Sequence, residues 1–212
     1  MKHLINPFSK QPIDEVTERL KNIHHALVKK SKESFLRVVD QDDIDNWGSY
    51  FKRLSVNTTD VDLLVGSSSQ KLIEIINILA TVERTIDALI WLQEQSKYSG
   101  YTVHVCHPST SDSDDETDIM LADGEGRISV MCEVTDVVNS NAGQNNKEKK
   151  SIMKLGCINE VPQDDIDRYI VTSIEYGDAL ASERRKWDEK FYRYCYVPLY
   201  MGPKRLICTN LI

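Results

Sequence analysis

The chain has 212 residues, of which 41% are apolar and 28% are charged, proportions that are ordinary for a globular protein. This length suits one sizeable domain, or a domain with a helical appendage. The sequence contains no apolar run long enough to span a bilayer and no signal peptide, so we expect a cytoplasmic protein.

The net charge of −7 argues weakly against a nucleic-acid partner, but the charge is unevenly distributed. Residues 109–125 contain acidic residues and no lysine or arginine, whereas bases outnumber acids over residues 183–205. An acidic chain of this kind can still present a local basic surface to a phosphate backbone. The five cysteines are widely spaced and form no C-x-x-C pair, which argues against a disulfide framework or a zinc site.

Two helices dominate the first half of the chain. Apolar residues at three- and four-residue steps predict an amphipathic helix over residues 12–30, with acids in its first turn and lysines at its end. A weaker helix is predicted over about residues 42–54. Residues 67–100 form the clearest helical pattern, with serines to cap its start and Gly100 to end it.

Strands and helices then alternate. Strands are predicted over residues 101–107, 117–122 and 127–135, and "DGEG" between the last two is typical of a hairpin turn. A helix is predicted within "NKEKKSIMKLGC", followed by a strand over residues 168–177 and a last helix over residues 178–195. The tail has β-rich pieces around Pro198 and Pro203.

This order of elements predicts the α/β class. A meander of three strands, a crossover helix and a fourth strand make a mixed central sheet flanked by helices. We expect a helical N-terminal region over residues 1–66, packed on a core over residues 67–212 within one structural domain.

Two carboxylates lie within the predicted hairpin. Asp118 opens the strand before the turn, and alternation places Glu133 on one face of the strand after it, together with Met131 and Thr135. Pairing of the two strands brings Asp118 and Glu133 to the same end of the hairpin. Two close carboxylates repel each other unless a cation lies between them, and rigid oxygen ligands suit Mg²⁺. The pair therefore indicates a metal site, and an exposed face with solvated acids is the alternative.

The order helix–strand–strand–strand–helix–strand, with Asp118 and Glu133 in these places, resembles the PD-(D/E)XK nuclease family, which includes many type II restriction endonucleases. The resemblance covers about residues 70–176. It implies a restriction-endonuclease-like core, αβββαβ, in which Asp118 is the first acid, Glu133 the second and Val134 the spacer. It also implies that both acids hold Mg²⁺ and that the products carry 5′-phosphate and 3′-hydroxyl ends.

Thr135 departs from the family pattern, because it stands where the motif has a lysine that positions or activates the attacking water. Lys149, with Lys147 and Lys150 beside it, opens the following helix and is a candidate replacement. A solvated helix start is the alternative for each of these lysines. Glu83 in the long helix is a candidate for the acid that some family members contribute from their first core helix. Its alternative is an ion pair on a solvent face.

Candidate DNA contacts follow the proposed site. Asn and Gln side chains can bind adenine edges, and lysine and arginine side chains can bind phosphates or guanine edges. The residues are Asn141, Gln144, Asn145, Lys147, Arg184, Arg185, Lys204 and Arg205. Solvated loops and helix faces are the alternative. The first helix, with its apolar stripe, is a candidate dimer interface, since twofold symmetry suits the cutting of both strands of a palindrome.

The predicted function is a Mg²⁺-dependent, sequence-specific endonuclease that acts on double-stranded DNA as a homodimer without a membrane partner. Thr135 keeps open a different class, in which the same fold is catalytically silent and serves as a DNA-binding or protein-interaction subunit. An enzyme acting on RNA or single-stranded DNA is a third alternative.

Overall fold

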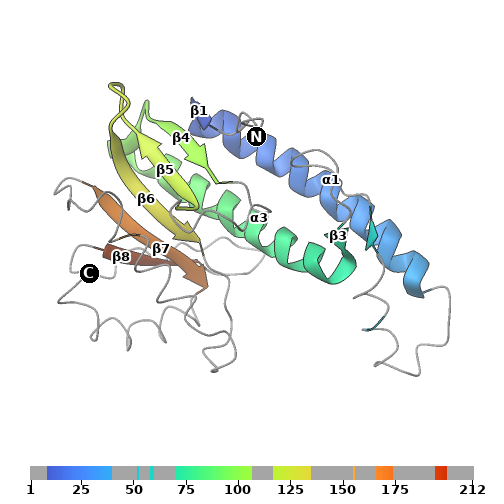
Figure 1. Ribbon diagram of the computed structural model, residues 1–212. Helices are drawn as coiled ribbons and strands as arrows, with labels where there is room; N and C mark the ends of the chain where they lie inside the picture. The colour runs from blue at the N-terminus through green and yellow to red at the C-terminus, as the bar shows by residue number, and fades with distance from the viewer. Residues whose placement is uncertain are drawn as a thin grey trace, which may run out of the picture. The chain divides into compact units, whose positions relative to one another are not determined.

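The computed structural model describes residues 9–39, 52, 58–59, 70–106, 117–134, 155, 166–173 and 194–199. Figure 1 shows the arrangement of the described elements. In chain order they are β1 (Ser9–Pro12), α1 (Ile13–Val39), β2 (Thr58–Thr59), β3 (Gln70–Lys71), α3 (Leu72–Glu94), the 3-10 helix η1 (Ser96–Tyr98), β4 (Thr102–Val105), β5 (Ile119–Ala122), β6 (Ile128–Val134), β7 (Asp167–Ser173) and β8 (Tyr194–Leu199).

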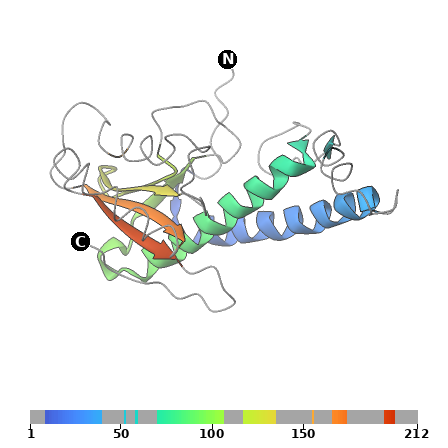
Figure 2. The ribbon, with the colours of Figure 1, turned by 90° about the horizontal axis from the view of Figure 1, so that it is seen from below.

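The described strands form a six-stranded mixed sheet in the order β1-β4-β5-β6-β7-β8, and a separate pair, β2-β3. β4, β5 and β6 make an antiparallel meander, and β1 pairs antiparallel with β4. β7 pairs parallel with β6, and β8 with β7, so the two lie side by side in Figure 2. The mixed α/β architecture predicted from the sequence is confirmed.

The directions of the strands bring several strand ends together at one edge of this sheet. β4, β6, β7 and β8 run in the same direction, so their carboxyl ends lie at the same edge, and β5 begins there because it runs antiparallel to its neighbours. We call this the carboxyl edge. The connections that leave β4, β6 and β7, and the tail after β8, all start from it.

The two faces of the sheet have different side chains, because partners in a ladder point to the same face and successive residues alternate. One face packs on α3, since Trp91 contacts Tyr169 edge to face, with ring centroids 4.9 Å apart. We call it the α3 face; it carries Val103, Leu121, Val130, Cys132 and Tyr169. The opposite face carries His104, Met120, Met131 and Arg168.

The turn between β5 and β6 is stabilised by Asp123. Its carboxylate accepts hydrogen bonds from the backbone N–H groups of Glu125 and Arg127, at 2.9 and 3.0 Å, and from the Arg127 side chain. These bonds, the backbone ones first, hold the pKa of Asp123 below its usual range. Gly126 takes the left-handed conformation, with φ of 79°, that glycine adopts at low cost. The predicted hairpin is therefore present, with its turn at the end opposite to Asp118.

The chain divides into two compact units, one of residues Met1–Thr17 and Arg84–Ile212 and the other of residues Glu18–Glu83. The first contains the six-stranded sheet. In the second, α1 and α3 pack through a small apolar core of Leu27, Leu72 and Ile75, lined by Ile23, Phe35, Ile78 and Leu79. The boundary predicted between residues 66 and 67 stays a prediction.

The apolar stripe of α1 is buried within the chain. Val16, Leu20 and Leu27 are at most 2% exposed, whereas Val28 and Leu36 are the exposed large apolar residues of the described part. The apolar stripe that was predicted to form a dimer interface is thus buried within the single chain. The homodimer stays a prediction, and this stripe no longer supports it. None of the helices in the described ranges is long and apolar enough to cross a membrane.

Several boundaries differ from those predicted. α3 is Leu72–Glu94, shorter than the predicted range 67–100, and η1 follows it before Gly100. α1 continues to Val39, well beyond the predicted end at residue 30, because Ser31 and Ser34 are buried and continue the packed face. The short strand β1 was not predicted. The last helix was predicted to reach residue 195, but β8 begins at Tyr194, where aromatic and β-branched residues pair with β7. Residues 42–54, apart from residue 52, and the rest of that last helix lie outside the described residues.

Candidate metal site

Asp118 and Glu133 lie opposite each other at the carboxyl edge. In the β5–β6 ladder Ile119 pairs with Cys132 and Met120 with Met131, so one further step brings Asp118 opposite Glu133. Alternation places both side chains on the face opposite to α3. Extension of the register by one step therefore places the two residues across from each other at this end of the hairpin.

Asp118 is held in place by the backbone on both sides. Its carbonyl accepts a hydrogen bond from the N–H of Cys106, at 2.8 Å, at the end of the β4–β5 ladder. Its Oδ2 accepts the N–H of Val134 at 2.7 Å. Register would place Thr117 opposite Val134, so the Asp118 carboxylate takes the position of a ladder carbonyl and ends the β5–β6 pairing. Asp118 therefore has a structural role at the end of the hairpin.

Glu133 is buried, with 3% of its surface exposed, in a strand whose neighbours on both faces are also buried. Burying a carboxylate is costly unless hydrogen bonds or a cation compensate its charge. The local field is negative: burial first, and then the charges of Asp118, Glu133 and Asp167, raise the pKa of the Cys132 thiol well above its usual range. A cation would be stabilised by this field.

The donor set fits a hard cation. Magnesium takes oxygen ligands, is bound through one or two protein carboxylates and keeps several waters. Asp118 and Glu133 supply two carboxylates on rigid strands, one of them with an oxygen already fixed by a backbone N–H. Within the described ranges no three His, Cys, Asp or Glu side chains gather into a group that could hold a metal. Two carboxylates are the number of protein ligands with which Mg²⁺ commonly binds while it keeps several waters.

The other predicted site residues are not brought to this pair by described contacts. Glu83 is exposed on α3. Its neighbour Arg84 is buried and lies 3.7 Å from Asp87, in an ion pair one turn apart. The remaining predicted residues lie outside the described part of the chain and stay predictions: Thr135, Asn141, Gln144, Asn145, Lys147, Lys149, Arg184, Arg185, Lys204 and Arg205.

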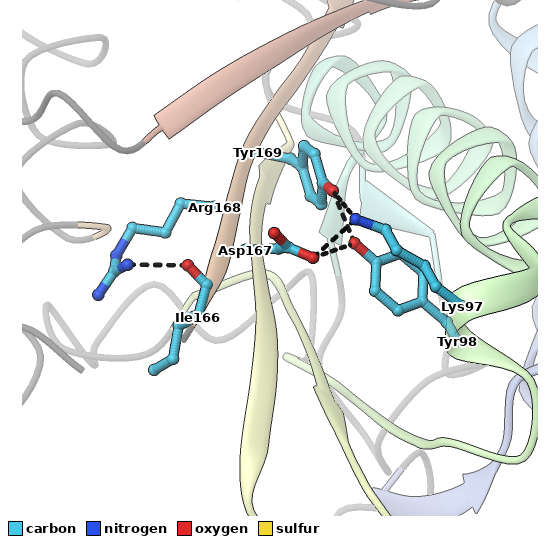
Figure 3. A network of polar contacts seen from close by, with 6 residues as sticks. All are labelled: Lys97, Tyr98, Ile166, Asp167, Arg168 and Tyr169. Atoms are coloured by element: carbon cyan, nitrogen blue, oxygen red, sulfur yellow. Dashed lines mark hydrogen bonds and ion pairs between the residues drawn. The ribbon is translucent and has the colours of Figure 1, made fainter. Parts of the chain in front are cut away.

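A second polar cluster was not predicted from the sequence. Lys97 and Tyr98 of η1 meet Asp167 and Tyr169 of β7, about seventy residues further along the chain, as Figure 3 shows. Lys97 Nζ lies 2.8 Å from Asp167 Oδ2 and 3.2 Å from Tyr169 Oη. Tyr98 Oη lies 2.7 Å from Asp167 Oδ2 and 2.6 Å from Tyr169 Oη. We call these four residues the tyrosine cluster.

The charged ends of this cluster fix the direction of its hydrogen bonds. A carboxylate only accepts, so the single hydroxyl proton of Tyr98 is donated to Asp167. The Tyr98 oxygen then accepts the proton of Tyr169, and the Tyr169 oxygen accepts from the Lys97 ammonium. Lys97 therefore donates a hydrogen bond to Tyr169, Tyr169 donates to Tyr98, and Tyr98 donates to Asp167. Lys97 also donates directly to Asp167, which completes a ring of four hydrogen bonds.

The pKa shifts in the cluster agree with neutral tyrosines. Burial raises the pKa of Tyr98 above the usual tyrosine range, and its hydrogen bonds raise it further. Burial also raises the pKa of Tyr169, although the hydrogen bond from Lys97 lowers it. For Lys97, burial lowers the pKa, but the hydrogen bonds to Asp167 and Tyr169 outweigh it and the net shift is upward. Each shift favours the charge state in which the ring forms.

The tyrosine cluster lies apart from the carboxylate pair. Asp167 pairs with Val130, three residues before Glu133 along β6, which corresponds to about 10 Å. Asp167 and Tyr169 also belong to the α3 face, whereas Glu133 belongs to the other. Lys97 is therefore not the cation that replaces the motif lysine at Thr135. No local pattern in the sequence connects η1 with β7, so the sequence alone did not indicate the tyrosine cluster.

The sequence matches no protein-family profile and no curated protein, and the fold matches no solved structure. The function is therefore argued from the carboxylate pair and the strands that carry it.

Proposed function

We propose that this protein is a Mg²⁺-dependent endonuclease of the PD-(D/E)XK type that hydrolyses phosphodiester bonds in double-stranded DNA at a specific sequence. The observation that carries the proposal is the placement of Asp118 opposite Glu133, on one face of a β-hairpin, at the carboxyl edge of a mixed sheet. The helix–strand–strand–strand order from α3 to β6, with β7 parallel to β6, supports a restriction-endonuclease-like core.

The two carboxylates divide the work of holding the cation. Glu133 is buried and rigid, so it offers an oxygen without a large loss of side-chain freedom on binding. Asp118 is fixed through Oδ2 by the N–H of Val134, so its carboxylate is already positioned at the end of the strand. A bound Mg²⁺ supplies Lewis-acid chemistry: it neutralises charge on the phosphate and lowers the pKa of a coordinated water. Hydrolysis would leave 5′-phosphate and 3′-hydroxyl ends.

The carboxyl edge also accounts for how DNA would reach the pair. The predicted base- and phosphate-contacting residues follow β6, β7 and β8 in the sequence, and these strands all end at this edge. Lys147 follows β6, Arg184 and Arg185 follow β7, and Lys204 and Arg205 follow β8. Ligands of open α/β sheets bind outside the carboxyl ends of strands in the same way.

The proposal is tested by digestion of plasmid DNA with Mg²⁺ or with EDTA. The wild-type chain should give discrete fragments with Mg²⁺ only, and Glu133→Gln, which keeps the buried volume, should reduce cleavage roughly 100-fold or more. Glu125→Gln is the matched control, because Glu125 is exposed at the turn of the same hairpin. Intact plasmid with the wild-type chain, or unchanged cleavage by Glu133→Gln, would refute the nuclease.

The motif departure at Thr135 favours one second candidate, a catalytically silent subunit that binds DNA or a protein through the same fold. The digestion separates the two. A silent subunit leaves the plasmid intact, yet retards a labelled duplex in a gel whether or not Glu133 is replaced.

A further inference from the structure

His104 lies on the same face of the sheet as the carboxylate pair. It pairs with Met120, which pairs with Met131, so the three side chains form a row across β4, β5 and β6. Asp118 and Glu133 make the adjacent row, one alternation nearer the carboxyl edge. His104 is thus the diagonal neighbour of Asp118, with Cα atoms separated by about 7–8 Å.

Exposure indicates the side from which a substrate would approach. On this face the residues of β4 and β5, namely His104 and Met120, are partly exposed, and so is Asp118. The residues of β6 on the same face, Met131 and Glu133, are buried. A phosphate that reaches the carboxylates therefore passes over β4 and β5, where the imidazole of His104 lies.

Two described cations near these strands have other partners. Lys97 belongs to the tyrosine cluster on the α3 face. Arg168 lies on the same face as Glu133, and its guanidinium donates to the carbonyls of Leu155 and Ile166, at 2.8 and 2.9 Å. Figure 3 shows the bond to Ile166, the residue before β7.

We propose that His104 takes over the role of the lysine missing at Thr135, as the base that receives a proton from the attacking water. This inference rests on the proposed nuclease. The water oxygen forms a bond to phosphorus while the imidazole nitrogen takes its proton, and the bond from phosphorus to O3′ breaks. The O3′ oxygen leaves with the electron pair and takes a proton from solvent, and His104 later returns its proton to solvent. Histidine is the side chain most often used for such transfer near neutral pH.

The test compares two variants of His104 with matched controls. His104→Ala should lower the single-turnover cleavage rate by about 100-fold or more, and added imidazole should restore part of it. His104→Gln keeps size and hydrogen bonding but cannot accept this proton, so it should be as slow and should not respond to imidazole. His25→Ala, on the exposed face of α1, and Glu125→Gln, at the exposed turn of the hairpin, should cleave at nearly the wild-type rate.

A second readout does not depend on cleavage. In EDTA, the carbon-bound imidazole proton signals of His104 should shift when a duplex containing the cleaved sequence is added, and those of His25 should not. Wild-type cleavage with an unchanged rate in His104→Gln, or a silent His104 signal, would overturn the role of His104 and leave the nuclease standing. Loss of cleavage in Lys149→Ala alone would do the same. Intact DNA with the wild-type chain would overturn both proposals.

Discussion

The direction of the hydrogen bonds in the tyrosine cluster predicts that two similar substitutions have unequal costs. Tyr98→Phe removes the proton donated to Asp167 and also the oxygen that accepts from Tyr169. Tyr169→Phe removes an acceptor of Lys97 and the donor to the Tyr98 oxygen, but Tyr98 keeps its bond to the carboxylate. The packing of Trp91 on the ring at position 169 is retained in both variants.

The magnitudes follow from which groups lose their partners. A hydrogen bond to a charged group contributes about 1.5–3 kcal/mol and a neutral one about 1 kcal/mol. Asp167 is 45% exposed, so water recovers part of the first loss, whereas the Tyr169 hydroxyl is left without its acceptor in a buried place. We expect Tyr98→Phe to lower the free energy of unfolding by about 2 kcal/mol and Tyr169→Phe by about 1 kcal/mol.

Equilibrium unfolding in urea at neutral pH measures both values, with Tyr101→Phe as the control. Tyr101 is partly exposed, its ring lies 5.8 Å from that of Tyr98, and its backbone N–H donates to the Tyr98 carbonyl. Tyr101→Phe keeps both the ring and the backbone bond, so it should change stability by less than about 0.5 kcal/mol. A Tyr169→Phe loss equal to or larger than that of Tyr98→Phe would refute the assigned direction of the hydrogen bonds.

The structure supports three further predictions. Folding raises the pKa of Tyr98 above its unfolded value near 10, so the stability that Tyr98 contributes is complete below pH ~10 and is lost as the pH rises further. In thermal unfolding from neutral to strongly alkaline pH, the Tm should therefore fall more steeply for the wild type than for Tyr98→Phe. Asp118→Ala should lower the free energy of unfolding by about 1–3 kcal/mol, since the N–H of Val134 loses its acceptor. Asp118→Asn keeps an oxygen there, so it should lower the free energy of unfolding by less. Chemical denaturation measures both values, and equal losses would contradict the hydrogen-bond role of Asp118. Cys132 is buried with a raised pKa, so in the native protein a thiol reagent should label Cys106 before Cys132. Peptide mass mapping measures the order, and labelling of Cys132 before Cys106 would contradict its burial.

Local patterns in the sequence were sufficient to predict the hairpin and the long helix. Alternation around "DGEG" predicted the two strands and their turn, which Asp123 organises. The register is not set by the turn alone, because a bulge after Leu121 shifts the pairing by one residue. Continued from the pair Ala122–Ile128 at the turn, the register would put Asp118 opposite Cys132, so the bulge, which no sequence pattern indicated, brings it opposite Glu133. The mixed sheet also followed from the order of strands and helices, since a crossover favours a parallel fourth strand.

Features that depend on distant segments were not predictable in this way. β1 has only four residues, "SKQP", without an apolar period, and it is specified by pairing with β4 rather than by its own composition. Its irregular register places Lys10 in a bulge with φ of 60°, which no sequence pattern indicated. The tyrosine cluster likewise exists only because the sheet brings η1 to β7. The position of His104 relative to Asp118 likewise depends on the β4–β5 register.

Calorimetric titration of the wild-type chain with Mn²⁺ or Mg²⁺ shows whether Asp118 and Glu133 together hold a divalent cation. We expect saturable binding that is weakened at least about tenfold in both Asp118→Asn and Glu133→Gln and unchanged in Glu125→Gln. Circular dichroism verifies that each variant is folded. Binding of equal strength in all four proteins, or no binding by the folded wild-type chain, would contradict this expectation.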